Sequence, residues 1–331
     1  MTSASSVDPG SPVSPTLLGE DDDDEPVVRR RRSSDVVRVV SARKPVHERV
    51  ADIWRARELL VNMVRTEIRV KYKSSFLGML WSMMSPAMTL AVYVLVFQVI
   101  LKNGIPNFVI FLFSGLLLWN LFQVGVQTAT GVVVNNAGLV KRVSFPREIL
   151  ALAAVGSASV FFFFQACVMV IFMVVLHTSP AWTLLWLLPV AMVPLLVLAS
   201  ALAIFLAAVN VYLRDTQHLI EVLVGAAWFW ACPIVYSYQS SVAPKLVHHG
   251  LTWLYFLNPV TPLIMTFQRV LYALVTAPST VPPHPVEHLL PSWGWLTYLW
   301  ADGAVLGVSL VLLYIALVVF GRLAGNFAEE L

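Results

Sequence analysis

The chain has 331 residues, of which 58% are hydrophobic and only 12% are charged. A soluble domain normally carries about twice that charged fraction, so the composition excludes an ordinary soluble protein and indicates a membrane protein. The formal net charge is only +3, but fourteen of the 22 lysines and arginines lie at or before Lys73.

Residues 1–45 are rich in serine and proline, and an acidic run, Asp21–Glu25, precedes a basic run, Arg29–Arg32. Such charged segments bury too little apolar surface to fold alone. We therefore expect residues 1–45 to form a disordered cytoplasmic tail. Because residues 1–50 contain no apolar core, we also expect no cleavable signal peptide.

Residues 46–75 predict an amphipathic helix. Polar and apolar side chains each recur at spacings of three and four, so each set covers one face. A helix this charged cannot span a bilayer, and we expect it to lie in the cytoplasmic interface. Three charges, Arg57, Glu67 and Lys71, lie near the apolar face, and Glu67 and Lys71 have the order that favours an i,i+4 ion pair. The polar face holds Glu58, Asn62, Arg65, Arg69 and Lys73, and the apolar face Leu60, Val64, Ile68 and Tyr72.

Six long apolar stretches follow, and Glu221 is the only charged residue or histidine within them. About 20 apolar residues cross a bilayer as a helix. Proton-coupled pumps and intramembrane enzymes usually carry ionisable groups at mid-membrane. The missing charges therefore favour a passive conduit or a permease driven by a separate subunit. We predict an all-α membrane protein with six transmembrane helices, at about 76–101, 108–134, 149–176, 183–211, 219–236 and 304–320.

The distribution of lysine and arginine predicts the orientation. With the N-terminus inside and six crossings, nineteen of these residues lie inside and three, Lys102, Lys245 and Arg269, lie outside. Basic residues favour the cytoplasmic side. We expect both termini to be cytoplasmic.

Residues 251–275 are apolar enough to span, but Pro259, Pro262 and Arg269 interrupt them and a proline-rich stretch follows. Proline removes a backbone hydrogen bond from a helix, and broken helices at membrane depth need surrounding protein or water. The pattern favours a re-entrant helical hairpin that dips in from outside. A seventh crossing, which would place Arg322 outside, is the alternative.

Two predicted cytoplasmic connections are candidate contacts for a partner. The segment 135–148 reads NNAGLVKRVSFPRE, in which a short helix can begin at Asn136 and another after Pro146. An ordinary basic loop would fit equally well. In the segment 210–218, NVYLRDTQH, a local salt bridge between Arg214 and Asp215 is the simpler interpretation.

Aromatic residues gather near the outer ends of the predicted spans. The simpler interpretation is the usual interfacial belt of tryptophan and tyrosine. The alternative is a pore whose rings stack on sugars, since rings and their hydroxyl or indole groups suit carbohydrate. The residues are Tyr93, Phe97, Trp119, Phe122, Trp228, Trp230, Tyr236 and Tyr238.

Several chemical signatures are absent from the sequence. It has no G-x-x-x-x-G-K-[ST] motif for ATP. His284 and His288 lie in a proline-rich loop, so their spacing does not make a metal site. Cys167 and Cys232 both lie in apolar spans and predict no disulfide framework. We expect a chain that is not an enzyme by itself and holds no cofactor or metal.

Five segments resemble the membrane subunits of ABC-2 type polysaccharide exporters, which export O-antigen, teichoic acid and related lipid-linked glycans. The resemblance runs from about Arg57 to the end, and the first forty-odd residues depart from it. The segments are RTEIRVKYKSSFLGMLWSMMSP (65–86), LVKRVSFPREIL (139–150), NVYLRDTQHLI (210–220), LNPVTPL (257–263) and FAEEL (327–331).

The resemblance implies a homodimer joined to two copies of a cytoplasmic ATPase subunit that binds ATP and Mg²⁺, in the bacterial plasma membrane. It implies no nucleic-acid partner. It also implies roles for three residue sets. The ATPase-coupling set is Leu139, Lys141, Arg142, Phe145, Pro146, Arg147, Glu148, Arg214 and Asp215. The gate or headgroup set is Glu58, Arg65, Arg69, Lys71, Tyr72 and Lys73. The channel aromatics are Tyr93, Phe97, Trp228, Trp230 and Tyr236.

The implied substrate is a glycan on a polyprenyl pyrophosphate carrier, such as an O-antigen-like glycan or a cell-wall galactan. An ABC-2 exporter of a drug or lipid is the nearest alternative. A membrane glycosyltransferase or acyltransferase would need carboxylates or histidines that converge at one depth, and the predicted spans supply none. A channel or scaffold would lack the ATPase partner.

Overall fold

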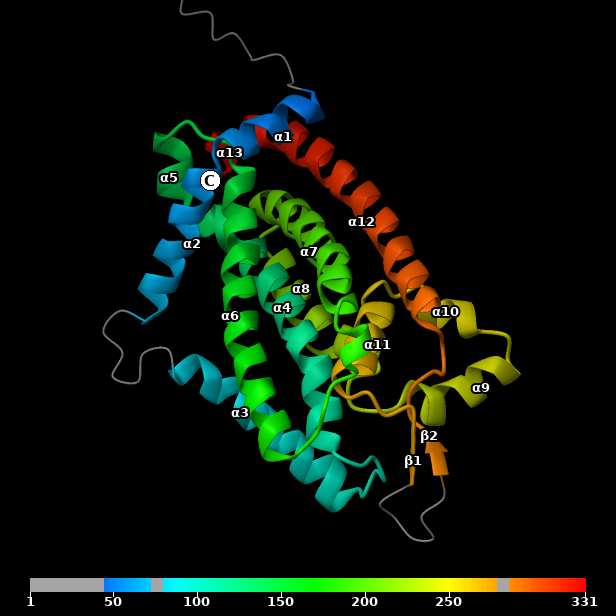
Figure 1. Ribbon diagram of the computed structural model, residues 1–331. Coiled ribbons are helices and arrows are strands. Elements are labelled where there is room, and N and C mark those ends of the chain that lie inside the picture. The colour runs from blue at the N-terminus through cyan, green and yellow to red at the C-terminus, as the bar shows by residue number, and fades with distance from the viewer. Residues whose placement is uncertain (1–44, 73–79, 279–285) are drawn as a thin grey trace, which may run out of the picture. The chain divides into compact units, whose positions relative to one another are not determined.

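A computed structural model of the chain describes residues 45–72, 80–278 and 286–331 (Figure 1). The predicted tail lies outside these residues, apart from Pro45, and so do Lys73 and His284. Within them the fold is helical, and the exception is a short antiparallel pair of strands, β1 (Thr276–Pro278) and β2 (Val286–His288), in which Thr276 pairs with His288.

The helical elements follow one another along nearly the whole described chain. They are α1 (Val46–Arg55), α2 (Arg57–Tyr72), α3 (Leu80–Tyr93), the π-helical η1 (Val94–Ile100), α4 (Phe108–Asn135), α5 (Ala137–Arg142), α6 (Glu148–Val175), η2 (Trp182–Leu184), α7 (Leu187–Tyr212), α8 (Thr216–Val222), the π-helical η3 (Leu223–Trp228) and η4 (Tyr238–Val242), α9 (Ala243–His248), α10 (Thr252–Phe256), α11 (Val260–Leu271), α12 (Trp295–Leu323), η5 (Ala324–Asn326) and α13 (Phe327–Glu330).

Four described helices are long and apolar enough to cross a bilayer: α4, α6, α7 and α12, the last continued by η5. They confirm four of the six predicted spans. The segment of the first predicted span contains the shorter apolar helix Pro86–Ile100, with Pro86 inside α3. In the segment of the fifth, α8 and η3 belong to one helical run over residues 216–230, which ends shortly before Pro233.

Helix α4 forms the centre of the fold. It packs against α6 on one side and α7 on another, and α11 also contacts it. Its apolar window is 78% buried, against 22% for α6 and 28% for α12. The uneven burial leaves α6 and α12 with broad exposed apolar faces, as expected of helices that contact lipid. Side chains that contact α4 are therefore more enclosed than side chains on the outer faces of α6 and α12.

The last span is longer than its sequence pattern suggested, and this corrects one expectation. The apolar run begins at Ala304, but α12 begins at Trp295 and so contains Asp302. The Asp302 side chain is buried, and the Thr266 hydroxyl lies 3.1 Å from its Oδ1 and 3.2 Å from its Oδ2. The hydroxyl joins α11 to α12. The helical body is therefore poor in ionisable residues, but it is not free of them.

Residues 251–275, predicted as a hairpin, form two helices. α10 and α11 are separated by residues 257–259, and Pro259 caps α11 because proline suits the start of a helix. α11 is buried along most of its length against α4 and α7. α11 is thus surrounded by protein, and its prolines lie at the start of the helix, where no internal hydrogen bond is lost.

Candidate functional site

One continuous aromatic cluster joins η1, α4 and η3. The Tyr93 ring stacks on Phe229 at 5.7 Å between centroids, and Trp230 lies 5.4 Å from Phe229 and 6.3 Å from Phe97. Trp119 of α4 lies 5.8 Å from Phe229. Four of the five predicted channel aromatics, Tyr93, Phe97, Trp228 and Trp230, therefore belong to this cluster, through links that include Trp119, Phe122 and Phe229.

Trp228 is fixed in place by Asn258 and Phe122, and the sequence did not indicate that either residue contacts it. Its indole Nε1 donates to Asn258 Oδ1 at 2.9 Å, and its ring meets Phe122 edge-on at 5.1 Å. Asn258 Oδ1 also accepts the backbone N–H of Val260, at the start of α11. The position of α11 thus sets the orientation of a candidate channel residue. The Asn-Pro pair in LNPVTPL marked Asn258 as a notable residue in the sequence. Its partner Trp228 lies 30 residues away, so the sequence did not reveal the contact.

The fifth predicted aromatic, Tyr236, lies beside the cluster. Its hydroxyl donates to the Trp230 carbonyl at 3.1 Å and lies 3.2 Å from the Tyr255 hydroxyl, and Tyr255 stacks on Tyr238 at 5.1 Å. Trp230 is half exposed, whereas Tyr93, Phe97, Trp228 and Tyr236 are partly buried. Phenol and indole groups at an accessible ring surface are suited to hydroxyl-rich ligands.

Helix α2 lies alongside the first half of α6 (Figure 1). The side chain of Val64 approaches Gly156, and Lys71 Nζ lies 4.2 Å above the Phe161 ring. Gly156 and Ser157 are small enough to let the two helices approach closely. α2 therefore follows the direction of a candidate span.

The amphipathic pattern of α2 is confirmed, because Glu58, Asn62, Arg65 and Arg69 are exposed while Leu60, Val64 and Ile68 are partly buried. Burial at the α6 contact raises the pKa of Glu67 above its usual value, although hydrogen bonding to Ser157 and the charge of Lys71 oppose the shift. Burial likewise lowers the pKa of Lys71. Lys71 thus serves the contact with α6, and Arg65 and Arg69 remain available to a ligand.

A bulkier residue at Gly156 is expected to separate α2 from α6. A Cβ atom placed there would lie 2.9 Å from Val64 Cγ2, closer than real Cβ contacts allow. Gly156→Val should speed hydrogen exchange of α2 by about tenfold, which corresponds to about 1.4 kcal/mol of lost docking free energy. Gly307→Val in α12 is the control, because nothing lies within 4 Å of a Cβ there. Equal exchange in both variants would contradict this packing.

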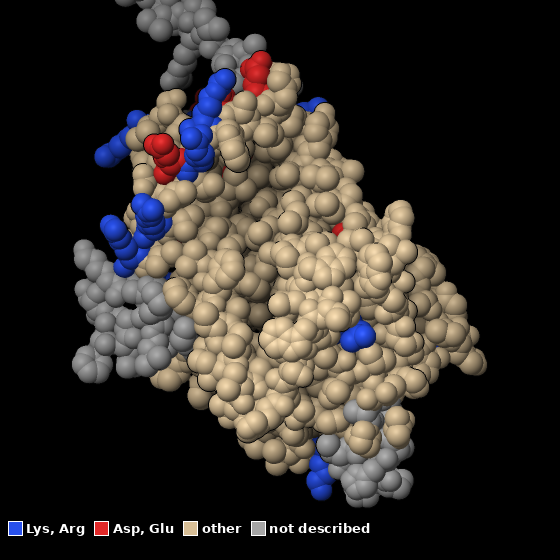
Figure 2. Space-filling model, viewed as in Figure 1, with Lys and Arg blue, Asp and Glu red and all other residues tan. Residues whose placement is uncertain are grey.

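Lysine and arginine gather at the end of the molecule where α1, α2 and α5 lie, which we call the basic end (Figure 2). Helix α5 presents Leu139, Lys141 and Arg142 as exposed side chains there. Phe145 and Pro146, which follow α5, are partly buried. An exposed cationic helix of this kind can contact a partner without rearrangement of the core.

Arg147 and Glu148, both predicted to contact a partner, have partners within the chain. Arg147 Nη1 donates to the Ala324 carbonyl, and its guanidinium lies 5.7 Å from the Phe327 ring centre. Glu148 is buried and accepts from Arg49 Nη1 at 3.2 Å. These contacts hold α1 and the C-terminal segment against the start of α6. A local sequence pattern could not reveal them, because the partners are 99 and 177 residues away.

Arg147→Ala is expected to loosen the C-terminal segment 324–331. A hydrogen bond to a charged group is worth about 1.5–3 kcal/mol, so amide exchange in this segment should rise about tenfold or more. Phe327 remains held by Tyr212 and Phe320, so the segment should stay attached to the body. Arg142→Ala, at an exposed position nearby, is the control. Unchanged exchange in Arg147→Ala would show that the contact contributes nothing.

The remaining predicted coupling residues, Arg214 and Asp215, are exposed at the junction of α7 and α8. Among the described residues no ion pair joins them, so the simpler interpretation of a local salt bridge finds no support. The described residues also contain no group of three or more His, Cys, Asp or Glu side chains that could hold a metal ion.

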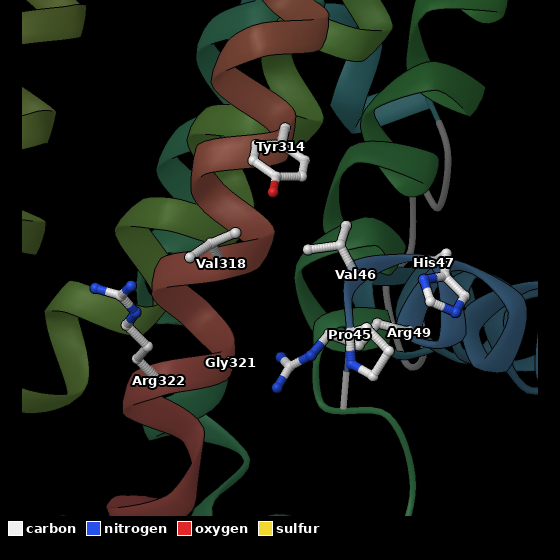
Figure 3. A pocket seen from close by; sticks show the side chains of 8 residues that line it. All are labelled: Pro45, Val46, His47, Arg49, Tyr314, Val318, Gly321 and Arg322. Carbon is white, nitrogen blue, oxygen red and sulfur yellow. The ribbon is translucent and has the colours of Figure 1, made fainter. Parts of the chain in front are cut away.

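A pocket of about 570 Å³ lies between the first turn of α1 and the last turns of α12 (Figure 3). The Arg49 side chain extends toward Gly321, where any Cβ would collide with its guanidinium. Since Arg49 also bonds Glu148, this side chain ties α1 to both α6 and α12. The lining residues are Pro45, Val46, His47, Arg49, Tyr314, Val318, Gly321 and Arg322.

Comparison with known proteins gives consistent matches over this same body. The family model of ABC-2 type transporters matches residues 58–272. The "O-antigen export system permease protein RfbA" of Myxococcus xanthus is 31% identical over 285 residues, 85% of this chain and 98% of that protein. Two proteins of the same name from Klebsiella pneumoniae are 25% and 23% identical over 274 residues, 83% of this chain and 95% of each relative.

Proposed function

The chain belongs to the ABC-2 type transporter family, and from this premise we propose that it is the permease subunit of an ATP-driven polysaccharide exporter. Two observations support the proposal. Its relatives are named as O-antigen export permeases, and an aromatic cluster joins η1, α4 and η3. A neutral, ring-lined surface suits a long glycan that is mostly uncharged.

The proposed substrate is a glycan on a polyprenyl pyrophosphate carrier. Arg65 and Arg69, on the exposed face of α2, would guide the pyrophosphate, because guanidinium groups bind phosphate oxygens through charge-assisted hydrogen bonds. An O-antigen-like glycan is the first candidate, and teichoic acid or a cell-wall galactan would satisfy the same chemistry. A drug or lipid exporter of the same family is the second candidate.

Energy in this proposal comes from a separate cytoplasmic subunit. Two copies of an ABC ATPase would bind ATP and Mg²⁺, and two copies of this chain would form the passage between them. The exposed residues of α5, Leu139, Lys141 and Arg142, would contact the ATPase. Closure of the ATPase pair would then move α5 together with the ends of α4 and α6 that flank it.

The proposed topology keeps six crossings in the bacterial plasma membrane, with both termini cytoplasmic. The segment α3–η1 would be the first crossing and α8–η3, continued to Tyr236, the fifth. α10 and α11 would form a hairpin that enters from outside. The location of the basic end, which carries α1, α2 and α5 (Figure 2), supports a cytoplasmic position for that end.

A complementation experiment tests the function. A strain that synthesises a lipid-linked polysaccharide but lacks its own permease is given this chain, with or without its cognate ATPase. We expect antibody-accessible polysaccharide on the cell surface only when both are present. Export of a lipid or drug while the polysaccharide stays inside the cell would favour the second candidate, a drug or lipid exporter. Polysaccharide export without any ATPase would contradict the coupled mechanism.

A further inference from the structure

A stripe of uncharged polar side chains runs along the middle of α4. Asn120, Gln123 and Gln127 are separated by three and four residues, so they share one face of the helix, and Thr128 lies at the edge of that face. We call these four residues the amide stripe. Thr128 is exposed, and the other three are partly buried. Val124, which lies between them, is also exposed at 39%, so the stripe and Val124 together form the accessible part of the middle of α4.

The amide stripe faces the short helical segment formed by α8 and η3. Gln127 Nε2 donates to the Glu221 carbonyl at 3.4 Å. A Cβ atom built on Gly225 would lie 3.5 Å from Nε2 of both Gln123 and Gln127. The glycine therefore lets the backbone of η3 approach both amides.

The stripe also connects with the aromatic cluster. Trp119 Nε1 donates to Gln123 Oε1 at 2.8 Å, and the Trp119 ring packs on Phe229. Asn120 Nδ2 donates to Gln165 Oε1 at 3.0 Å. Within the described chain, no hydrogen bond uses Gln123 Nε2 or Gln127 Oε1, so a donor and an acceptor remain available side by side.

The depth of the stripe makes its polarity costly unless water or a polar ligand is present. The 28 residues of α4 extend about 42 Å, longer than the roughly 30 Å hydrocarbon core, and the stripe occupies their central part. Unpaired polar groups cost several kcal/mol in hydrocarbon. A lipid-facing surface is therefore a poor explanation for the unused donor of Gln123 and the unused acceptor of Gln127.

We infer that the amide stripe is a glycan-contacting wall of a water-filled passage, and this inference rests on the proposed function. Primary amides donate and accept hydrogen bonds at once, as sugar hydroxyls do. The stripe carries no charge, so it can bind successive neutral sugars without selecting an ion. The rings beside it supply stacking surfaces, and the amides supply directional hydrogen bonds that release as the chain advances.

Cysteine labelling tests the aqueous passage. Thr128→Cys is introduced into the chain that carries Cys167→Ala, and the complete complex with its ATPase is kept in membranes. Cys232 is buried, and the chain with Cys167→Ala alone gives the background labelling. A charged, membrane-impermeant maleimide should label Thr128→Cys about tenfold faster than Val170→Cys. Val170 is an exposed apolar position on α6. Labelling of Thr128→Cys that is no faster than that of Val170→Cys would overturn the inference, because it would mean that lipid or a second copy of the chain covers this position.

Transport assays test the contact with glycan. Gln123→Leu combined with Gln127→Leu should lower the export rate about tenfold while assembly with the ATPase stays unchanged. Gln123→Asn with Gln127→Asn keeps the amides and should retain most of the rate. Rapid labelling with unchanged export in the leucine variant would overturn the glycan contact and leave the proposed function intact. Absence of export by the unaltered complex would instead reject the proposed function, and labelling would still report on the passage.

Discussion

Reversing both charges of α5, by Lys141→Glu with Arg142→Glu, is expected to lower ATP-driven export by about tenfold or more. Both side chains are exposed, and the described structure assigns them no internal partner. The variant should therefore fold and enter the membrane normally. Loss of export would come from repulsion or lost attraction at the surface that contacts the ATPase.

The measurement for the α5 variant compares export, ATPase binding and thermal stability in the same preparation. Arg147→Ala provides the contrast, since its side chain is tied to Ala324 and Phe327. The α5 variant should lose ATPase binding at unchanged stability, and Arg147→Ala should lose stability first. If the α5 variant binds the ATPase and exports glycan normally, α5 is not the contact surface.

Reversing Arg65 and Arg69 is expected to weaken recognition of the pyrophosphate carrier. Charge-assisted hydrogen bonds contribute about 1.5–3 kcal/mol each, so the KM for a lipid-linked substrate should rise at least about tenfold. Both residues lie on the exposed face of α2, away from the contact with α6. The docking of α2 should therefore survive the double substitution.

Two control variants separate recognition from docking. Arg57→Glu, also exposed on α2, makes the same charge reversal at one position about two turns away and should leave KM nearly unchanged. Lys71→Glu should mainly release α2 from α6, because Lys71 lies over Phe161. An unchanged KM in the Arg65 and Arg69 double variant would reject these residues as the carrier site.

The sequence predicted the long spans well because length and missing charge are local properties. The apolar runs beginning at Phe108, Ile149 and Thr183 each became a single long helix. The sequence failed to place the start of α12, because Asp302 interrupts the charge-free run and separates the apolar segment beginning at Trp295 from the rest of the span. Only its packing on α7 and α11 buries Asp302.

The candidate site could be predicted only in part, because its geometry depends on contacts between distant segments. The channel aromatics were identifiable by residue type and by their place near helix ends. The link from Trp228 to Asn258, and the pairing of Arg49 with Glu148, require the folded chain. Glu67 and Lys71 lay near the apolar stripe of their helix, and this unusual position did indicate a contact.

Transport in vesicles of defined composition tests most directly whether this chain depends on a separate ATPase for its energy. Lipid-linked glycan is supplied to vesicles that contain this chain alone or together with its ATPase, with ATP or with an imposed proton gradient. We predict transport only when the ATPase and hydrolysable ATP are both present. Uphill transport by the chain alone, driven by the proton gradient, would contradict the account and would direct attention to the buried Asp302.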